Sequence, residues 1–461
     1  MNKTETPELS AAVLGRLRDY ATLFRDDFCR HDQARWTALY LQGLLRDGER
    51  KSIEPLARRV VLPAEWDIQD PAQALQNFVN QSPWQEKLLW QRYRRHLAQT
   101  FASPQGIFVV DDVSCPKQGR HAVGVQRQYC GALGKKANCQ VAVSLHYVSP
   151  RGHYPLALQL YLPQSWVPEQ GPLTRAQRRR LEEAGVPDEQ RWFRTKGQLA
   201  LALLDQVRSE GLPGNVVVTD AGYGTATDFR QGLHDRGLFY LAGVTGETGV
   251  FAEAPRWQRP PPTGNGRPPS RCRLATDSPP PLSVQELGTR VPLRRKTWRE
   301  GTKGKLSGRF AWLRVWPAHG WQQGQCAVAE PVWLLIEEQA DGQIKYALSN
   351  LPAATTCVRA IRLWKSRWPV EQGYQQMKEE LGLDHFEGRS WRGFHHHACL
   401  VMLAFGFLLL ERLRITESAP GAPLAWQTLP AIRRALQRLL LPQFPLECPH
   451  CREMIQHPLL N

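Results

Sequence analysis

The sequence predicts an α/β core interrupted by a β-rich insertion, with a helical region before it and helices after it. The core is indicated by two continuous apolar runs, 107–110 and 216–219, which are typical of strands buried on both faces of a sheet. Further strand and helix patterns surround these runs. The strands are expected at 121–130, 138–147, 153–162 and 238–244, and the helices at 174–184, 196–210 and 225–236.

Composition changes divide the chain into segments. Prolines crowd residues 254–282, where no regular element is expected, and short strands are expected at 292–315 and 325–349. Helical patterns return at 356–378 and 394–440. We expect five parts: a helical DNA-binding region at 1–100, a first catalytic part at 101–250, a proline-rich and β-rich insertion at 251–349, a second catalytic part carrying Glu371 at 350–415, and a helical tail at 416–461. The first part has a second interpretation, as a helical collar around the core.

The charge predicts an anionic partner. The formal net charge is +16 and the isoelectric point is near 9.6, with the cations spread along the chain among aromatic residues. This distribution favours a nucleic-acid surface over a membrane surface. The longest apolar run, 398–410, is too short to span a bilayer, and the N-terminus has no apolar signal core. We therefore expect a cytoplasmic protein with reduced cysteines.

Three acidic positions follow the predicted elements in a particular order. The pair Asp111-Asp112 and then Asp220 come directly after the two apolar strands, and Glu371 lies on a helix further along. Each aspartate alone is as readily a turn or helix cap. Three carboxylates that converge need a cation between them, and oxygen ligands favour Mg²⁺ or Mn²⁺. Two such ions suit phosphodiester transfer.

The helix that carries Glu371 also carries cations at regular spacing. Arg367 precedes Glu371 by four residues and Lys378 follows it by seven. Glu371 and Lys378 then lie within about 20° of each other on one helix face. The pattern fits a metal-binding carboxylate beside a polyanion, and it also fits an ordinary charged helix.

The segments 107–147, 216–224 and 363–397 resemble DDE transposases of bacterial insertion sequences, in the branch with the Y-R-E-K signature. Trp364 stands at the Tyr position of that signature, and Arg367, Glu371 and Lys378 match the rest. The resemblance implies an RNase H-like catalytic domain whose catalytic residues are Asp111 or Asp112, Asp220 and Glu371, with Asp111, Asp220 and Glu371 as metal ligands. It implies DNA contacts by Trp364, Arg367 and Lys378, and by Lys117 and Arg389 within the matched runs.

The same resemblance implies a function. The chain is expected to bind the double-stranded ends of its own element, cleave them with two Mg²⁺ or Mn²⁺ ions and join them to target DNA, as a dimer assembled on DNA in the bacterial nucleoid. The alternatives are a nuclease of the same fold that cuts without joining, and an inactive DNA-binding protein derived from a transposase.

The insertion and two smaller motifs supply further candidates. The 151-residue step from Asp220 to Glu371 leaves room for an insertion in which related transposases use a Trp to hold a flipped base. Trp298, with Arg299 beside it, is the candidate, and a Trp packed in a small β-core is the alternative. The run 395–397, three histidines, is expected at the DNA-facing end of a helix. Cys448 and Cys451 form one half of a zinc motif.

Overall fold

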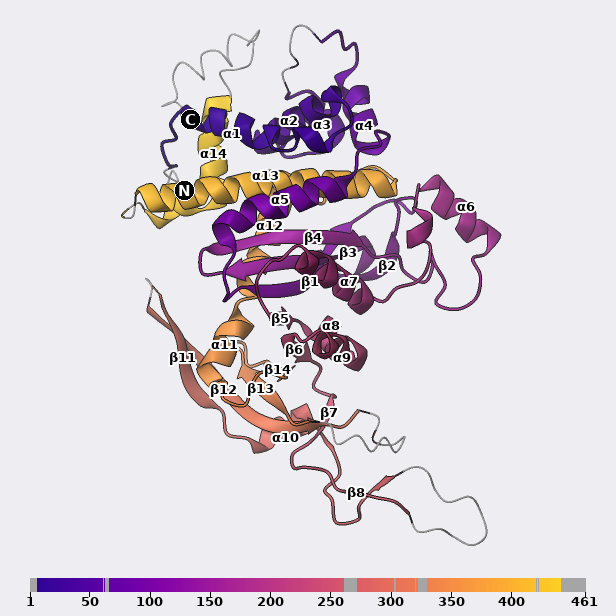
Figure 1. Ribbon diagram of the computed structural model, residues 1–461, viewed down its shortest axis with the longest axis vertical. Coiled ribbons are helices and arrows are strands. Elements are labelled where there is room, and N and C mark those ends of the chain that lie inside the picture. The colour runs from indigo at the N-terminus through magenta and orange to yellow at the C-terminus, as the bar shows by residue number, and fades with distance from the viewer. Residues whose placement is uncertain are drawn as a thin grey trace.

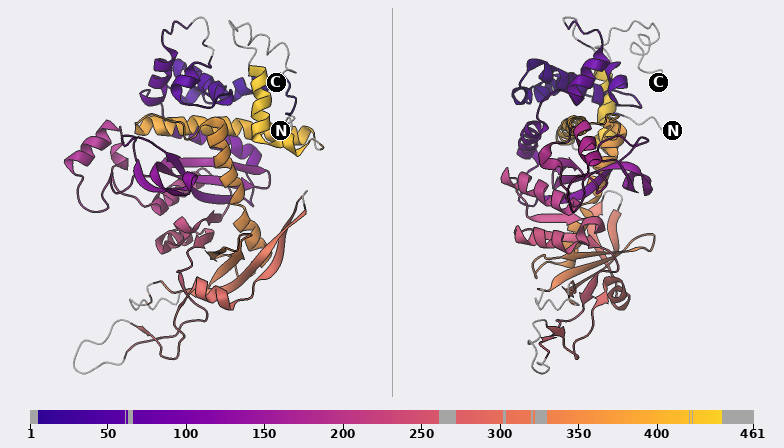
Figure 2. Two further views of the ribbon diagram at one scale, coloured as in Figure 1. Left: turned by 180° about the vertical axis from the view of Figure 1, so that it is seen from behind. Right: turned by 90° about the vertical axis from the view of Figure 1, so that its right-hand side faces the viewer.

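The computed structural model describes residues 6–60, 62, 66–260, 272–301, 304–319, 321, 330–419, 421 and 423–440. One large mixed sheet lies at its centre, with helices on both sides (Figures 1 and 2). The core strands are β1 (Ile107–Pro116), β2 (Gln126–Cys130), β3 (Lys135–Ser149), β4 (Gly152–Leu160), β5 (Val216–Thr219) and β6 (Phe239–Val244). This arrangement confirms the predicted α/β core.

The topology of the core follows from how its strands pair. β1, β5 and β6 are parallel neighbours, and β3 lies antiparallel on the other side of β1, where it pairs with both β2 and β4. The parallel strands β1 and β5 are apolar where they pair because helices cover both faces there. With the short strand β2 set aside, the sequence order is three antiparallel strands, β1, β3 and β4, followed by β5 and β6 parallel to β1, as in RNase H-like domains.

The insertion extends the same sheet beyond β6. Its strands are β7 (Gly249–Phe251), β10 (Leu282–Ser283), β11 (Arg294–Gly301), β12 (Gly304–Pro317), β13 (Val332–Glu338) and β14 (Ile344–Ser349), with helix α10 (Val284–Arg290) between β10 and β11. β14 joins the edge of β6, and β13, β12 and β11 follow outward. Within the described part of the proline-rich segment, only the two-residue strands β8 (Trp257–Gln258) and β9 (Arg273–Leu274) form.

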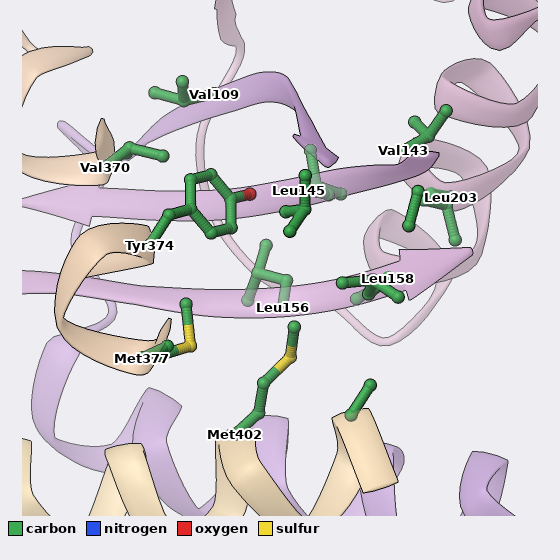
Figure 3. Close-up of a cluster of buried hydrophobic side chains, with 14 of the residues drawn as sticks. Val109, Val143, Leu145, Leu156, Leu158, Leu203, Val370, Tyr374, Met377 and Met402 are labelled. Atoms are coloured by element: carbon green, nitrogen blue, oxygen red, sulfur yellow. The ribbon is translucent and has the colours of Figure 1, made fainter. Parts of the chain in front are cut away.

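Helices pack on the two faces of the core sheet. On one face lie α7 (Lys196–Ser209), α8 (Ala221–Gly224) and α9 (Thr227–Asp235), and α12 (Trp368–Leu381) lies on the other. Figure 3 shows Tyr374 of α12 pointing toward the strands near Leu145, and Met377 of the same helix lying near Leu156 and Met402. This packing fixes the helix that carries Glu371 against β1 and β3. The helices α6 (Arg175–Glu183) and α11 (Cys357–Lys365) complete this part of the chain.

The long helix α13 (Trp391–Ser418) joins the core to the N-terminal helices (Figure 1). Those helices are α1 (Ala12–Thr22), α2 (His31–Leu45), α3 (Ile53–Ala57), α4 (Pro71–Asn80) and α5 (Glu86–Phe101), and α14 (Leu429–Leu440) packs beside them. In the part of the chain that the structure describes, no helix is long and apolar enough to cross a membrane.

The three histidines at 395–397 are buried, so the expectation that they face DNA is wrong. His396 contacts the backbone oxygens of Val79 and Trp84 at 2.9 and 3.0 Å, and its ring stacks on Trp84 at 3.4 Å. His397 contacts the Tyr40 hydroxyl at 2.9 Å. Burial lowers the pKa of His396 to about 3 and that of His397 to about 4, so both are neutral at pH 7. They connect α13 to the N-terminal helices.

Candidate active site

Asp111 and Asp220 lie at the same level of the sheet because β1 and β5 are parallel and in register. The last pair of that register is Val110 with Thr219, so the two aspartates are the next residue on each strand. β5 ends there, since Asp220 caps α8 by accepting a hydrogen bond from the Gly222 amide at 3.0 Å. β1 does not end at Asp111-Asp112 as its sequence suggests. It runs on to Pro116, because β3 continues to pair with it.

A close approach of two backbones holds Asp220 in place. Gly243 of β6 lies against the start of α8, and a Cβ at this position would lie 2.8 Å from the Asp220 carbonyl carbon and the Ala221 nitrogen. Only glycine fits there without a shift of one backbone. The position of Asp220 therefore depends on Gly243 as well as on its own strand.

The adjacent residues Asp111 and Asp112 point to opposite faces of the sheet. Asp111 faces α12, where its Oδ2 lies 3.4 Å from a guanidinium nitrogen of Arg367. Asp112 faces α7 and α8, where it forms an ion pair with Lys196 and accepts a hydrogen bond from the Tyr223 hydroxyl. Asp111 is thus the member of the pair on the side of Glu371.

Arg367 lies between two of the carboxylates. It is the last residue before α12, whose second residue is Pro369, and the same Nη2 atom that contacts Asp111 lies 3.2 Å from Glu371 Oε1. Proline is accepted in the first helical turn because no backbone donor is needed there. The Arg367 side chain is 15% exposed, whereas that of Glu371 is 56% exposed. Glu371 therefore extends toward solvent, beside the largely buried side chain of Arg367.

Burial dominates the electrostatics of Asp111. The pKa of its carboxyl group is raised to about 6, chiefly by desolvation; the Arg367 charge lowers the pKa and the negative charge of Asp220 raises it, and both effects are included in that value. A second positive charge, in addition to that of Arg367, would stabilise the ionised form of this carboxylate. The electrostatics therefore favour cation binding on the α12 side of the sheet.

Two of the predicted DNA-contacting lysines are bonded to the protein itself. Lys378 Nζ donates to the Ser114 carbonyl oxygen at 2.8 Å, two turns along α12 from Glu371. Lys117 donates to the Phe386 carbonyl oxygen and is largely buried, which lowers its pKa. Both ammonium groups have neutral partners, so their charge still acts near the site. Arg389 and Arg299 are exposed.

Trp364 is turned inward, in contrast to the predicted DNA contact. It is 7% exposed, and its indole nitrogen donates to Glu337 of β13 at 2.7 Å. The motif identifies the position of Trp364, but the sequence does not show that Glu337 of the insertion is its hydrogen-bond partner.

Trp298 is half-buried within the insertion. Its ring meets Phe310 edge to face at 5.6 Å, and the Lys365 ammonium lies 5.3 Å from the ring centre. These contacts are those of a Trp packed in a β-core. By contrast, Trp368, which the sequence analysis did not single out, is 63% exposed and follows Arg367 directly. The sequence signal for Trp368 was its position directly after Arg367, the first cation of the regularly spaced pattern.

The donor set fits a hard divalent cation, although its side chains are not arranged around one. Asp111, Asp220 and Glu371 offer only oxygen ligands, the kind that Mg²⁺ and Mn²⁺ prefer. Among the described residues, no group of three or more His, Cys, Asp or Glu side chains has the geometry to hold a metal ion. Arg367 separates Asp111 from Glu371. Cys448 and Cys451, the half zinc motif, lie outside the described residues.

Comparison with known proteins defines the class. Residues 23–305 match the family model of the DDE superfamily endonucleases, and the chain belongs to this family. Enzymes of the superfamily generally depend on divalent metal ions. The matched residues include Asp111 and Asp220 and end before Glu371.

The description of one curated relative is more specific than that of the family. The chain is 28% identical over 203 residues to a protein of Microchaete diplosiphon described as "Probable transposase for insertion sequence element IS701". The aligned segment covers 44% of this chain and 46% of the relative, so the chain spans less than half the length of the relative it matches.

Proposed function

We propose that this protein is the transposase of an insertion sequence. It binds the terminal inverted repeats of its own element in the cytoplasm, cleaves the DNA there and joins the freed 3′-ends to target DNA. The observation that carries the proposal is that Arg367 contacts both Asp111 and Glu371, while Asp220 follows the neighbouring strand at the level of Asp111. Membership of the DDE superfamily and the likeness to an insertion-sequence transposase support it.

Asp111, Asp220 and Glu371 are the proposed ligands of two Mg²⁺ or Mn²⁺ ions. When bound, such ions activate the attacking oxygen and stabilise the leaving oxygen of a phosphodiester. Asp111 is assigned to this set in preference to Asp112 because it faces Arg367 and Glu371, whereas Lys196 and Tyr223 hold Asp112 on the opposite face.

We assign Arg367 two roles, one toward the carboxylates and one toward DNA. Its guanidinium group neutralises Asp111 and Glu371 in the metal-free protein, and it turns to a DNA phosphate when the carboxylates take up metal. Trp368 lies beside it with most of its ring exposed, and we assign to Trp368 the stacking on an unpaired base near the cleaved bond. Trp298 and Phe310 instead support the insertion from inside.

The N-terminal helices are proposed to bind the double-stranded repeat. Arg18, Arg25 and Arg35 line a hollow between α1 and α2, and α1, α2 and α14 surround it. Three cations at one hollow suit phosphate contacts that position the protein on a duplex. Because two ends of an element must be cut and joined together, the active form is a dimer assembled on DNA.

A plasmid that carries the gene with its flanking DNA tests the proposal. The purified protein and Mg²⁺ should cut this plasmid at the element's ends and join those ends to a second DNA molecule. Cutting without joining would identify a nuclease, and end binding without cutting would identify a DNA-binding protein. Either result overturns the proposed transposition.

A further inference from the structure

A buried carboxylate of the insertion contacts the segment that leads into the catalytic helix. Glu337 lies on β13 and is 3% exposed. One carboxylate oxygen accepts the indole N–H of Trp364 at 2.7 Å, and the other forms an ion pair with the Lys365 ammonium. A carboxylate in such surroundings is tolerated only when it is fully paired, so the three side chains form one unit.

The insertion encloses this unit on the other sides. The Lys365 ammonium lies 5.3 Å from the ring centre of Trp298 and 5.9 Å from that of Phe310. Phe310 stands directly opposite Glu337 across β12 and β13. In addition, Arg362 donates to the Trp298 carbonyl oxygen at 2.8 Å. The end of α11 is thus attached to β11, β12 and β13 together.

Only Ser366 separates Lys365 from Arg367. The Arg367 guanidinium carbon lies 5.8 Å from the ring centre of Trp364, so the same ring that Glu337 fixes also borders Arg367. Arg367 in turn contacts both Asp111 and Glu371. A short chain of contacts therefore leads from the insertion strand β13, through Trp364, to the two carboxylates.

We propose that Glu337 is a positioning residue of the active site, which holds the junction between α11 and α12 so that Arg367 and Glu371 face Asp111. The inference rests on the proposed function, since it assigns Glu337 a role in that reaction. It also explains the Trp at the Tyr position of the signature: an indole N–H is a donor only, and its acceptor is supplied by the insertion.

Glu337→Gln tests the role with little change of shape. The amide oxygen can still accept from Trp364, but the negative charge that pairs with Lys365 is lost. We expect the rate of end cleavage, at saturating plasmid and Mg²⁺, to fall about tenfold, because displacements of an ångström or less at a reacting centre cost rates of this order. The dissociation constant for end DNA should change less than about twofold, because the Glu337 side chain is itself buried and cannot contact DNA.

Glu338→Gln is the matched control. Glu338 is the next residue of β13 and, like Glu337, pairs with a cation, Arg309 at 2.8 Å, but it contacts neither α11 nor α12 in any described interaction. Its loss should leave the cleavage rate unchanged. Lys365→Met, which removes the other half of the ion pair, should slow cleavage like Glu337→Gln, and the double variant should be no slower than either single one.

Three results would overturn the inference. Glu337→Gln and Lys365→Met could cleave at the wild-type rate, Glu338→Gln could slow cleavage equally, or the double variant could show the product of the two single losses. If Lys365→Met does not fold, because it leaves the buried Glu337 carboxylate without its ion pair, Glu337→Gln alone decides, since it removes that charge and keeps the shape of the side chain. A wild-type protein that never cuts DNA would overturn the proposed function itself, which distinguishes that failure from a normal rate in the variants.

Discussion

Replacing Asp111 by asparagine is expected to stabilise the metal-free protein at neutral pH. The carboxylate is buried beside Asp220, and its pKa rises from the ordinary 3.8 to about 6. Each pKa unit corresponds to 1.36 kcal/mol, so the charge costs the folded state about 3 kcal/mol at pH 7, with the opposing effect of Arg367 already included. Asparagine removes that cost and keeps nearly the same shape.

The pH dependence gives the sign of the effect. Because the pKa of Asp111 is raised on folding, its stabilising contribution is fully present below about pH 4 and is lost as the pH rises through about 6. The difference in unfolding free energy between Asp111→Asn and wild type should therefore be about 3 kcal/mol at pH 8 and close to zero at pH 4. Urea titrations in EDTA at these two pH values measure it.

Asp112→Asn is the control for this prediction. Asp112 has an ion pair with Lys196 and a hydrogen bond from Tyr223, so its replacement should destabilise the protein at pH 8. An Asp111→Asn protein that is no more stable than wild type at pH 8 would refute the reasoning, because Asp111 would then not be a desolvated carboxylate next to Asp220.

Three further predictions concern the metal, the aromatic residues and the N-terminal helices. Mg²⁺ or Mn²⁺ should raise the melting temperature of wild type and support cleavage, EDTA should abolish cleavage, and Ca²⁺ should permit DNA binding with little cutting; cleavage that continues in EDTA would contradict a metal site. Trp368→Ala should lower cleavage about tenfold at unchanged melting temperature, whereas Trp298→Ala should lower stability by about 2–3 kcal/mol; the reverse pattern would restore Trp298 as the stacking residue. His396→Ala should cost about 3 kcal/mol, measured by urea unfolding, because the neutral ring loses its hydrogen bond to one of the backbone oxygens of Val79 and Trp84 and its stack on Trp84; a neutral result would show that His396 does not join α13 to the N-terminal helices.

The sequence was sufficient for the core because the core obeys local rules. Buried parallel strands are apolar runs, so β1 and β5 were predicted, and their register alone brings Asp111 level with Asp220. The spacing of Arg367, Glu371 and Lys378 likewise predicted a helix that carries all but the first of them. The choice between Asp111 and Asp112 for the proposed site required the structure, because it depends on which face of the sheet each side chain points to.

Tertiary partners explain what the sequence could not predict. Trp364 and Trp298 are aromatic residues among cations, a pattern typical of DNA contacts, but Glu337 of β13 binds the first and Phe310 of the paired strand β12 packs on the second. β1 continues past its two aspartates because β3 pairs with it to Pro116, and no local signal in β1 shows that partner. The histidines of α13 were misassigned for the same reason, since His396 contacts the backbone oxygens of Val79 and Trp84 and His397 contacts the Tyr40 hydroxyl, all in the N-terminal region.

The cleavage rate of the Glu371→Gln variant decides whether this protein uses a three-carboxylate site. Glu371 lies beyond the residues that match the family model, and its side chain is 56% exposed, so the change should leave the fold and DNA binding intact. With Mg²⁺ and the plasmid that carries the gene and its flanking DNA, we expect the variant to bind the ends with wild-type affinity and to cleave them at less than about one thousandth of the wild-type rate. A variant that cleaves at the wild-type rate would show that Glu371 is not the third carboxylate.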